Sequence, residues 1–203
     1  MAKLISADLT NNKLCVLEYT TTNRRMIDIN PDSFDARVVS HTYTDMGKII
    51  FQEPITVIGL RAFEDCSILT SITIPDSVTS IGTETFYNCG GLTSITIPDS
   101  VTTIGWNAFK DCSSLTSITI PDSVTTIGGY AFSGCDNLKR VIIGKSVSEI
   151  GRDAFNDCNI DTIVCYPEIP PKIKDSFGKF ENLIVPTGCE EEYANSDWGK
   201  YLE

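Results

Sequence analysis

Only one histidine, His41, is present among the 203 residues of the chain. Metal centres built from several histidines are therefore excluded, and any Ser-His or Cys-His catalysis would have to use that residue. Basic residues are also few, because 16 Lys and Arg stand against 27 Asp and Glu and leave a net charge of −11. A chain this acidic repels phosphate backbones and anionic lipid, which argues against nucleic-acid binding.

Long apolar runs are missing as well. No stretch approaches the roughly 18 consecutive apolar residues of a membrane span, so we expect no membrane insertion. Residues 1–8 contain no apolar core of signal-peptide length, so either the protein is cytoplasmic or a leader has been removed. The chain also has no CxxC pair, no GxGxxG run and no GxxxxGK(S/T) run. We therefore predict no metal site and no cofactor.

What the sequence does contain is a repeat of 23 residues. The letters LTSITIPDSVT occur three times, at 69–79, 92–102 and 115–125. Three further markers keep the same phase through five units, and such self-similarity is the signature of a repeat architecture. The markers are Ile58-Gly59, Ile81-Gly82, Ile104-Gly105, Ile127-Gly128 and Ile150-Gly151; Phe63, Phe86, Phe109, Phe132 and Phe155; and Cys66, Cys89, Cys112, Cys135 and Cys158.

Each unit has one set of apolar positions and cannot bury that set alone. Stacking of the units into a solenoid is therefore expected. The run Ile72-Thr73-Ile74 alternates apolar and polar residues and predicts a short strand, which Pro75 ends. The Ala-Phe segment is too short for a long helix and predicts one helical turn. The glycine after each isoleucine either adopts a positive φ in a turn or lets two backbones pass closely.

The unit L-T-S-I-T-I-P-D-S-V-T-x-I-G-x-x-A-F-x-x-C closely resembles the 23-residue repeat of bacterial BspA-like leucine-rich-repeat proteins. The resemblance covers roughly residues 46–165. It implies a right-handed leucine-rich-repeat solenoid, β-rich, with short strands and helical turns. It also implies a bacterial cell-surface or secreted protein that takes part in adhesion or host interaction.

We expect both ends of the array to be capped, because a bare end exposes apolar core and unpaired strand edges. The strand-like runs 14–19 and 25–29 predict a β-hairpin over the first coil. Ile49 lies 23 residues ahead of Ile72, which places the first strand of the solenoid near Lys48. The predicted parts are an N-terminal β cap at 1–47, the repeats at 48–165 and a C-terminal cap at 166–203, which resembles the closing segment of the family.

The five cysteines at the repeated position are predicted to be buried free thiols. Side chains in the same slot of successive coils point the same way, whereas a disulfide needs converging Cβ vectors. A free cysteine also packs as a small apolar residue. Outside this slot, a Cys165–Cys189 bridge is left open, although nothing in the sequence supports it.

Positions that differ between units are predicted to face the solvent. Three of them place Tyr87, Trp106 and Tyr130 on one side of consecutive coils, where an aromatic cluster can anchor a partner. The alternative is scattered surface aromatics without a role.

The strand face is the second candidate surface. The family resemblance favours it, because the concave sheet is the usual binding surface of leucine-rich repeats. Its outward residues include Thr73, Thr96 and Thr119, and the pattern then breaks at Arg140 and Ile142. Rows of hydroxyls can bind a repetitive ligand such as a glycan, but paired threonines also simply stabilise a sheet.

The favoured function is a non-catalytic module that binds a protein or glycan at a bacterial surface or after secretion. The alternative is an intracellular or purely structural repeat scaffold, because eight cysteines tolerate a reducing compartment. An enzyme is the third and weakest interpretation. The carboxylates of Asp76, Asp99 and Asp122 follow the strand proline in three units, and turn chemistry explains their spacing.

Overall fold

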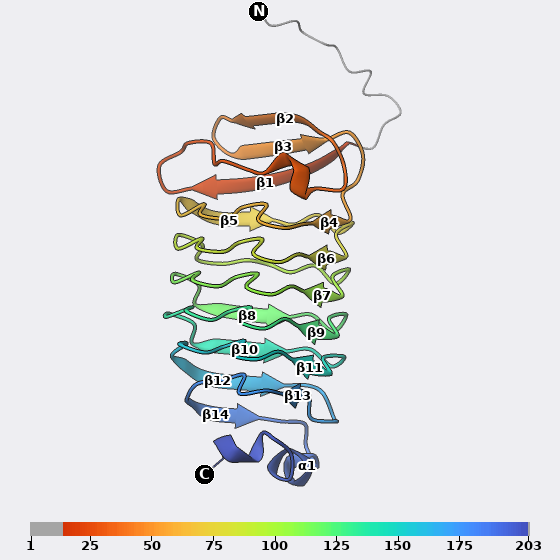
Figure 1. Ribbon diagram of the computed structural model, residues 1–203, viewed down its shortest axis with the longest axis vertical. Helices are drawn as coiled ribbons and strands as arrows, with labels where there is room; N and C mark the ends of the chain where they lie inside the picture. Colours follow the sequence, from red (N-terminus) through yellow and green to blue (C-terminus); the bar gives the residue numbers. More distant parts are fainter. Residues whose placement is uncertain (1–13, 203) are drawn as a thin grey trace, which may run out of the picture.

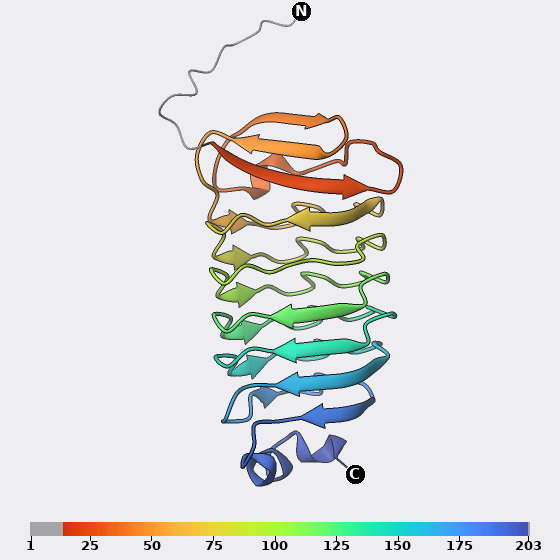
Figure 2. The ribbon, with the colours of Figure 1, turned by 180° about the vertical axis from the view of Figure 1, so that it is seen from behind.

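A computed structural model describes residues 14–202 as a stack of coils (Figures 1 and 2). Most coils add a longer strand to one wall and a two-residue strand to a second wall, and a turn segment leads to the next coil. The longer strands are β5 (Leu69–Thr73), β8 (Ser117–Ile120), β10 (Arg140–Ile143), β12 (Ile160–Cys165) and β14 (Phe180–Ile184). The short strands are β4 (Val57–Ile58), β6 (Ser80–Ile81), β7 (Thr103–Ile104), β9 (Thr126–Ile127), β11 (Glu149–Ile150) and β13 (Lys172–Ile173). The predicted solenoid is confirmed.

The short strands form one continuous parallel sheet in the order β13-β11-β9-β7-β6-β4. Neighbouring strands pair at the repeat offset, as Ile81 does with Ile104 and Ile104 with Ile127. Hydroxyls add bonds between coils, since Oγ1 of Thr102 donates to the carbonyl of Thr79 at 3.2 Å. Every 23 residues the backbone thus reaches the equivalent position in the next coil.

Phenylalanine rings form a stack through the interior, with neighbouring ring centroids 5.0–5.1 Å apart from Phe63 to Phe177. The repeated cysteines beside the rings are buried free thiols, as predicted. Their S–H groups donate to carbonyls of the preceding coil, as Cys112 does to Phe86 at 3.2 Å. Cys165 and Cys189 are free thiols too.

The turn segments differ from the predicted helical turn. They consist of hydrogen-bonded turns with two left-handed residues per coil, such as Arg61 at φ 58° and Asp65 at φ 60°. The glycines ahead of them serve close backbone contact. A Cβ on Gly105 would lie 2.5 Å from the carbonyl carbon of Gly82, so a larger residue would force the coils apart.

The N-terminal end also departs from the sequence-based prediction. Residues 25–29 form no strand, so the predicted hairpin between 14–19 and 25–29 is wrong. Instead, β1 (Cys15–Thr21) inserts antiparallel between β3 (Gly47–Phe51) and β5. The outer strand β2 (Val38–Tyr43) completes the order β2-β3-β1-β5.

The insertion of β1 changes the pairing of the first coil. Ile49 lies opposite Leu17 of β1, and not beside Ile72 as the 23-residue offset predicts. The free backbone edge of β5 accepts a strand in either direction, and edge pairing leaves no side-chain signature in the sequence. Between β1 and β2 the chain forms the short helix η1 (Pro31–Ser33). The carbonyl of Ser33 accepts a hydrogen bond from the N–H of Gly59 at 2.6 Å.

At the other end, β13 and β14 extend both walls before the chain forms α1 (Glu190–Ala194) and η2 (Gly199–Tyr201) below the last coil (Figure 1). Trp198 is fully buried there, with its ring centroid 5.1 Å from that of Phe177. The large aromatic ring thus shields the last phenylalanine of the interior stack from water.

Candidate ligand-binding surfaces

The strand wall is the side of the stack formed by the longer strands, and the five candidate residues predicted on it fall into two groups. Thr73 and Thr96 are exposed and form an isolated bridge, but residues 92–97 make no longer ladder and interrupt the wall. Beyond the interruption, exposed Thr119 lies beside half-buried Ile142, and Arg140 is exposed on the same strand pair. The hydroxyl rows therefore do not lie on one continuous sheet.

The turn face is the surface formed by the segments that connect each short strand to the next longer strand. Trp106 is 57% exposed there, and its ring centroid lies 6.3 Å from that of half-buried Tyr130. The ammonium of Lys110 lies 5.8 Å from the ring of Tyr87 and 5.9 Å from the ring of Tyr130. Lys110 thus links Tyr87 and Tyr130 through cation–π contacts, and the ring contact between Tyr130 and Trp106 adds the third aromatic residue to the cluster.

Sequence reasoning missed Lys110 as a member of this cluster. It occupies the slot after phenylalanine, which holds Tyr87 one coil earlier. Because successive coils place equivalent side chains one coil apart, this shared slot could have identified Lys110. Tyr130 occupies a different slot, the second residue after Ile-Gly in the following coil. The ammonium of Lys110 therefore lies near one ring from the preceding coil and one ring from the following coil.

Gly129 gives the indole of Trp106 room to lie against the next coil. A Cβ on Gly129 would be 3.0 Å from Cζ3 of Trp106 and 3.2 Å from its Cε3. Trp106 and Gly129 occupy the same slot of successive coils, so any larger residue at position 129 would push the indole away. The exposed ring is therefore held against the backbone of its neighbour.

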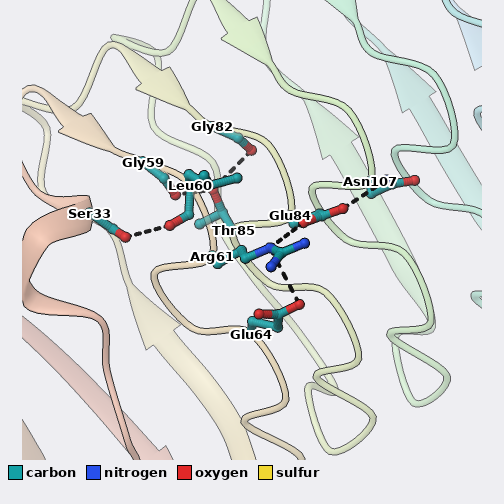
Figure 3. Close-up of polar contacts among 9 residues, drawn as sticks. All are labelled: Ser33, Gly59, Leu60, Arg61, Glu64, Gly82, Glu84, Thr85 and Asn107. Carbon is teal, nitrogen blue, oxygen red and sulfur yellow. Dashed lines mark hydrogen bonds and ion pairs between the residues drawn. The ribbon is translucent and has the colours of Figure 1, made fainter.

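On the turn face, polar side chains of successive coils contact one another (Figure 3). Nε of Arg61 lies 2.5 Å from Oε2 of Glu84, and Nδ2 of Asn107 donates to Oε1 of Glu84 at 3.4 Å. Arg61 also lies 3.6 Å from Glu64. Both oxygens of the Glu84 carboxylate are thus oriented by neighbours from the coils on either side.

Arg61, Glu84 and Asn107 share a left-handed backbone conformation that most residue types disfavour. The second residue after Ile-Gly has a positive φ of 53–58° in five coils, at Arg61, Glu84, Asn107, Tyr130 and Asp153. A left-handed residue costs about 1–2 kcal/mol unless it is Gly, Asn or Asp. Tyr130 therefore carries strain that an asparagine would relieve, and such strain concentrates at functional sites.

Burial shifts the pKa of several titratable groups in the interior. Burial raises the pKa of the Cys66, Cys112 and Cys165 thiols to about 12, so these groups stay protonated and unreactive at neutral pH. Burial lowers the pKa of His41, against the opposing effect of the Asp28 charge. Nε2 of His41 is hydrogen-bonded to Oη of Tyr19 at 2.7 Å.

Residues 14–202 contain neither a cluster of metal-ligand side chains nor a helix able to span a membrane. In that part of the chain, no group of three or more His, Cys, Asp or Glu side chains is arranged to hold a metal ion. The longest helix there, α1, has five residues, and none of the helices has the length and apolarity needed to cross a bilayer.

A family model described as "BspA type Leucine rich repeat region" matches residues 38–169 in six copies. A comparison with curated proteins found no match. Among solved structures, a leucine-rich-repeat protein of T. pallidum is 22% identical with a TM-score of 0.56, over 89% of this chain and 98% of its own. The pneumococcal vaccine antigen PcpA is 21% identical with a TM-score of 0.53, over 70% of this chain and 39% of its own. These two structures share the fold of this chain.

Proposed function

Because this chain belongs to the BspA-type leucine-rich-repeat family, we propose that it is a non-catalytic module that binds a protein or glycan ligand on its turn face. Strain at Tyr130 is the observation that carries the proposal, since its φ of 56° is costly for a tyrosine. The Tyr130 ring contributes instead to an outer cluster with Trp106 and Lys110. Every coil has this conformation at the same slot, so what supports a ligand is the presence there of a tyrosine in place of the asparagine or aspartate that other coils use.

Of the two ligand classes, the turn face favours a glycan. A standard protein interface takes about 800 Å² from each partner and has a core poor in charge. Around Trp106, however, charged side chains such as Arg61, Glu84 and Arg152 interrupt the apolar surface. A sugar ring needs only an aromatic face for its C–H groups and fixed polar side chains for its hydroxyls, and Trp106, Glu84 and Asn107 provide these.

The spacing of the coils also suits a repetitive ligand. Successive coils are 5.0–5.1 Å apart, as measured between phenylalanine rings. One hexose unit of an extended glycan advances by a comparable length. A glycan lying along the stack would therefore meet equivalent slots with successive units.

Binding to immobilised glycans and to matrix proteins tests this proposal. We expect the wild type to bind at least one oligosaccharide on a glycan array and Trp106→Ala to lose most of that binding. Thr119→Ala, an exposed change on the strand wall, is the matched control and should bind as the wild type does. Loss in Thr119→Ala but not in Trp106→Ala would move the site to the strand wall, around Arg140 and Ile142.

We also propose a bacterial cell-surface or secreted location with a role in adhesion, because proteins of this family are often bacterial surface proteins. Protease shaving of intact producing cells, followed by mass spectrometry, tests the location. Peptides of this chain released from unlysed cells support it. Peptides found only after lysis would contradict it.

The second candidate function is an intracellular or structural scaffold. The eight free cysteines favour it, since seven of them are buried thiols of a kind that persists in a reducing compartment. A scaffold predicts that Trp106→Ala changes no binding to glycans or matrix proteins, and that shaving releases no peptides before lysis.

A further inference from the structure

The single histidine of the chain lies in the N-terminal cap and takes no part in the turn face. His41 is a residue of β2, the outermost strand of the sheet in the order β2-β3-β1-β5. It is half-buried, and its ring centroid lies 5.7 Å from that of Tyr19 on β1. Because histidine is the side chain whose unperturbed pKa lies between pH 5 and 8, His41 is the group of this chain best suited to respond to mild acid.

The hydroxyl of Tyr19 connects β2 to residues 22–34, which follow β1 and are called the cover segment here. Oη of Tyr19 is hydrogen-bonded to Nε2 of His41 at 2.7 Å and accepts a hydrogen bond from the N–H of Ile27 at 3.4 Å. Tyr19 is 1% exposed, so water has almost no access to this hydroxyl. The ring of Tyr19 lies against Gly47 of β3, where any Cβ would clash with it. Three parts of the cap therefore hold the phenol in one position.

The cover segment closes the N-terminal end of the interior stack. Ile27 and Phe34 of this segment are 3% and 8% exposed. The ring centroid of Phe34 lies 5.8 Å from that of Phe63, the first ring of the repeats. The N–H of Asn30 donates to the carbonyl of Ala62 at 3.2 Å, which attaches the segment to the first coil. Displacement of the cover segment would expose the apolar end of the stack.

Protonation of His41 disrupts the hydrogen bonds of Tyr19. While His41 is neutral, the hydroxyl of Tyr19 donates to Nε2 and accepts from Ile27, so each of the three groups has a partner. A protonated imidazole carries hydrogen on both ring nitrogens. Nε2 must then donate to the hydroxyl, and the phenol proton of Tyr19 loses its acceptor. A buried donor without an acceptor costs free energy, which opening of the cap recovers because water then reaches the hydroxyl.

The charges around His41 have opposing effects on its protonation. From the cover segment, Asp28 attracts a proton to the imidazole. From β3, the residue opposite His41 is the apolar Ile49. The charges of Lys48 and Glu18 lie on the other face of the sheet and pair with each other at 2.9 Å. Burial outweighs the charge of Asp28 and lowers the pKa of His41 below its ordinary value of about 6.5.

Three further titratable groups lie near His41 and add no charge to this region. Tyr43 of β2 and Tyr19 have ring centroids 6.0 Å apart, and both phenols are neutral near neutral pH. The thiol of Cys66 donates to the carbonyl of Asp28 at 3.0 Å, and burial keeps this thiol protonated by raising its pKa to about 12. His41 is thus the group here that changes charge in mild acid.

We propose that His41 makes the N-terminal cap sensitive to mild acid, so that uptake of one proton separates β2 and the cover segment from β1 while the repeats stay folded. The closed cap binds this proton less readily than the open cap. Closure is therefore fully favoured above about pH 6.5 and weakens as pH falls through the lowered pKa of the closed form. Since one proton is taken up, the ratio of open to closed cap rises by up to about tenfold for each pH unit below 6.5.

Hydrogen exchange of the full chain, followed by mass spectrometry at pH 7.5, 6.5 and 5.5, tests the proposal. After correction for the intrinsic pH dependence of exchange, peptides from β1, β2 and the cover segment should exchange up to about tenfold faster at pH 5.5 than at pH 7.5. Peptides from residues 92–150, which contain no histidine, should not change.

Two variants assign the acid response to the imidazole. His41→Gln does not titrate and keeps an acceptor for the hydroxyl of Tyr19, so it should abolish the response. Thr42→Gln is the matched control, because Thr42 is the exposed neighbour on the same strand and its replacement leaves the imidazole in place. This variant should respond to acid as the wild type does.

An NMR titration of the wild type provides a second measurement that needs no variant. The chain has one histidine and therefore one imidazole signal, whose pKa should lie below 6.5. A value above 6.5 would mean that acid tightens the cap, which would overturn the proposal. Absence of the exchange response in the wild type, or its persistence in His41→Gln, would overturn it as well. Faster exchange throughout residues 92–150 would show that the whole chain opens and would also contradict a device confined to the cap.

Discussion

The interior of the stack and its turn face are built from the same 23-residue units, but they vary in different ways. Interior slots hold the same residue in coil after coil, as the phenylalanine and cysteine positions do. On the turn face, the residue after Ile-Gly is Leu60, Thr83, Trp106, Gly129 or Arg152. An interior residue contacts its own equivalent in the next coil, so a residue that packs well once packs well throughout. A turn-face residue contacts water or a ligand, and the repeat does not constrain it.

The largest expected effect is on the interior. Phe109→Ala should lower the free energy of unfolding by about 3–5 kcal/mol, because it opens a cavity in the ring stack between Phe86 and Phe132. Urea unfolding followed by circular dichroism measures the change. A loss below about 1 kcal/mol would mean that the ring stack is not the main core.

Gly105→Ala should come next, with a loss of about 1–3 kcal/mol. Its new Cβ would lie 2.5 Å from the carbonyl carbon of Gly82, and that backbone cannot move without separating two coils. Gly90→Ala is the matched control, since the nearest atom to its Cβ is Oγ of Ser113 at 3.4 Å. Equal losses in the two variants, measured by the same unfolding experiment, would show that coil spacing is not set by these glycines.

Alkaline pH should weaken the interior through its thiols. Burial raises the pKa of Cys66 and Cys112 in the folded chain to about 12, whereas an unfolded thiol titrates near its ordinary pKa of about 8.5. Between these values the unfolded state releases protons that the folded state retains, so stability falls as pH rises. We expect the contribution of the thiols to be constant below about pH 8 and to fall by up to about 1.4 kcal/mol per pH unit for each buried thiol above about pH 9.

The urea midpoint measured from pH 7 to pH 11 tests this effect. Cys112→Ala should reduce the slope above pH 9, because it removes one of the titrating groups. An unchanged slope in that variant would contradict the assignment of the effect to the thiols.

Substitutions on the turn face are expected to raise the free energy of unfolding or to leave it almost unchanged. Tyr130→Asn should raise the free energy of unfolding by about 0.5 kcal/mol, because asparagine tolerates the left-handed conformation that strains tyrosine. Thermal unfolding of the two proteins measures the difference. A clear loss of stability would mean that the Tyr130 ring supports the fold, which would remove the main argument for a ligand.

The smallest change is expected for Trp106→Ala, within about 0.5 kcal/mol of the wild type. The indole is 57% exposed and lies outside the ring stack. The same thermal measurement checks the value. A loss as large as that of Phe109→Ala would show that the two regions do not differ in the way described above.

The sequence alone was sufficient to predict the interior but only part of the surface, because Tyr87 and Tyr130, which were predicted to face the solvent, are half-buried. It predicted the burial of Phe109 and Cys112 and the exposure of Trp106, because each follows from a period that the sequence displays directly. It did not predict the left-handed residues of the turn segments. Asn107 and Asp153 are residue types that tolerate this conformation, but Arg61 and Tyr130 in the same slot are not. Only the backbone angles show that the slot is left-handed in every coil.

The aromatic cluster was predicted in part. Tyr87, Trp106 and Tyr130 were identified from their slots, whereas the position of Lys110 between two of the rings depends on how far a flexible side chain reaches across coils. The hydroxyl rows of the strand wall were predicted as uniform. Identical sequence in three units does not guarantee identical pairing, and the wall is interrupted at residues 92–97.

The sequence by itself determined the coil, because a 23-residue period with one apolar set per unit can bury that set only by stacking. Tertiary structure alone decided the two ends. β1 inserts between β3 and β5 through backbone hydrogen bonds, which any residues can make. The loop at residues 166–171 is held by hydrogen bonds from Tyr193 and Trp198, more than twenty residues further along the chain. A local sequence pattern describes only the side chains of one segment. These two arrangements depend on contacts with segments that are distant in the sequence.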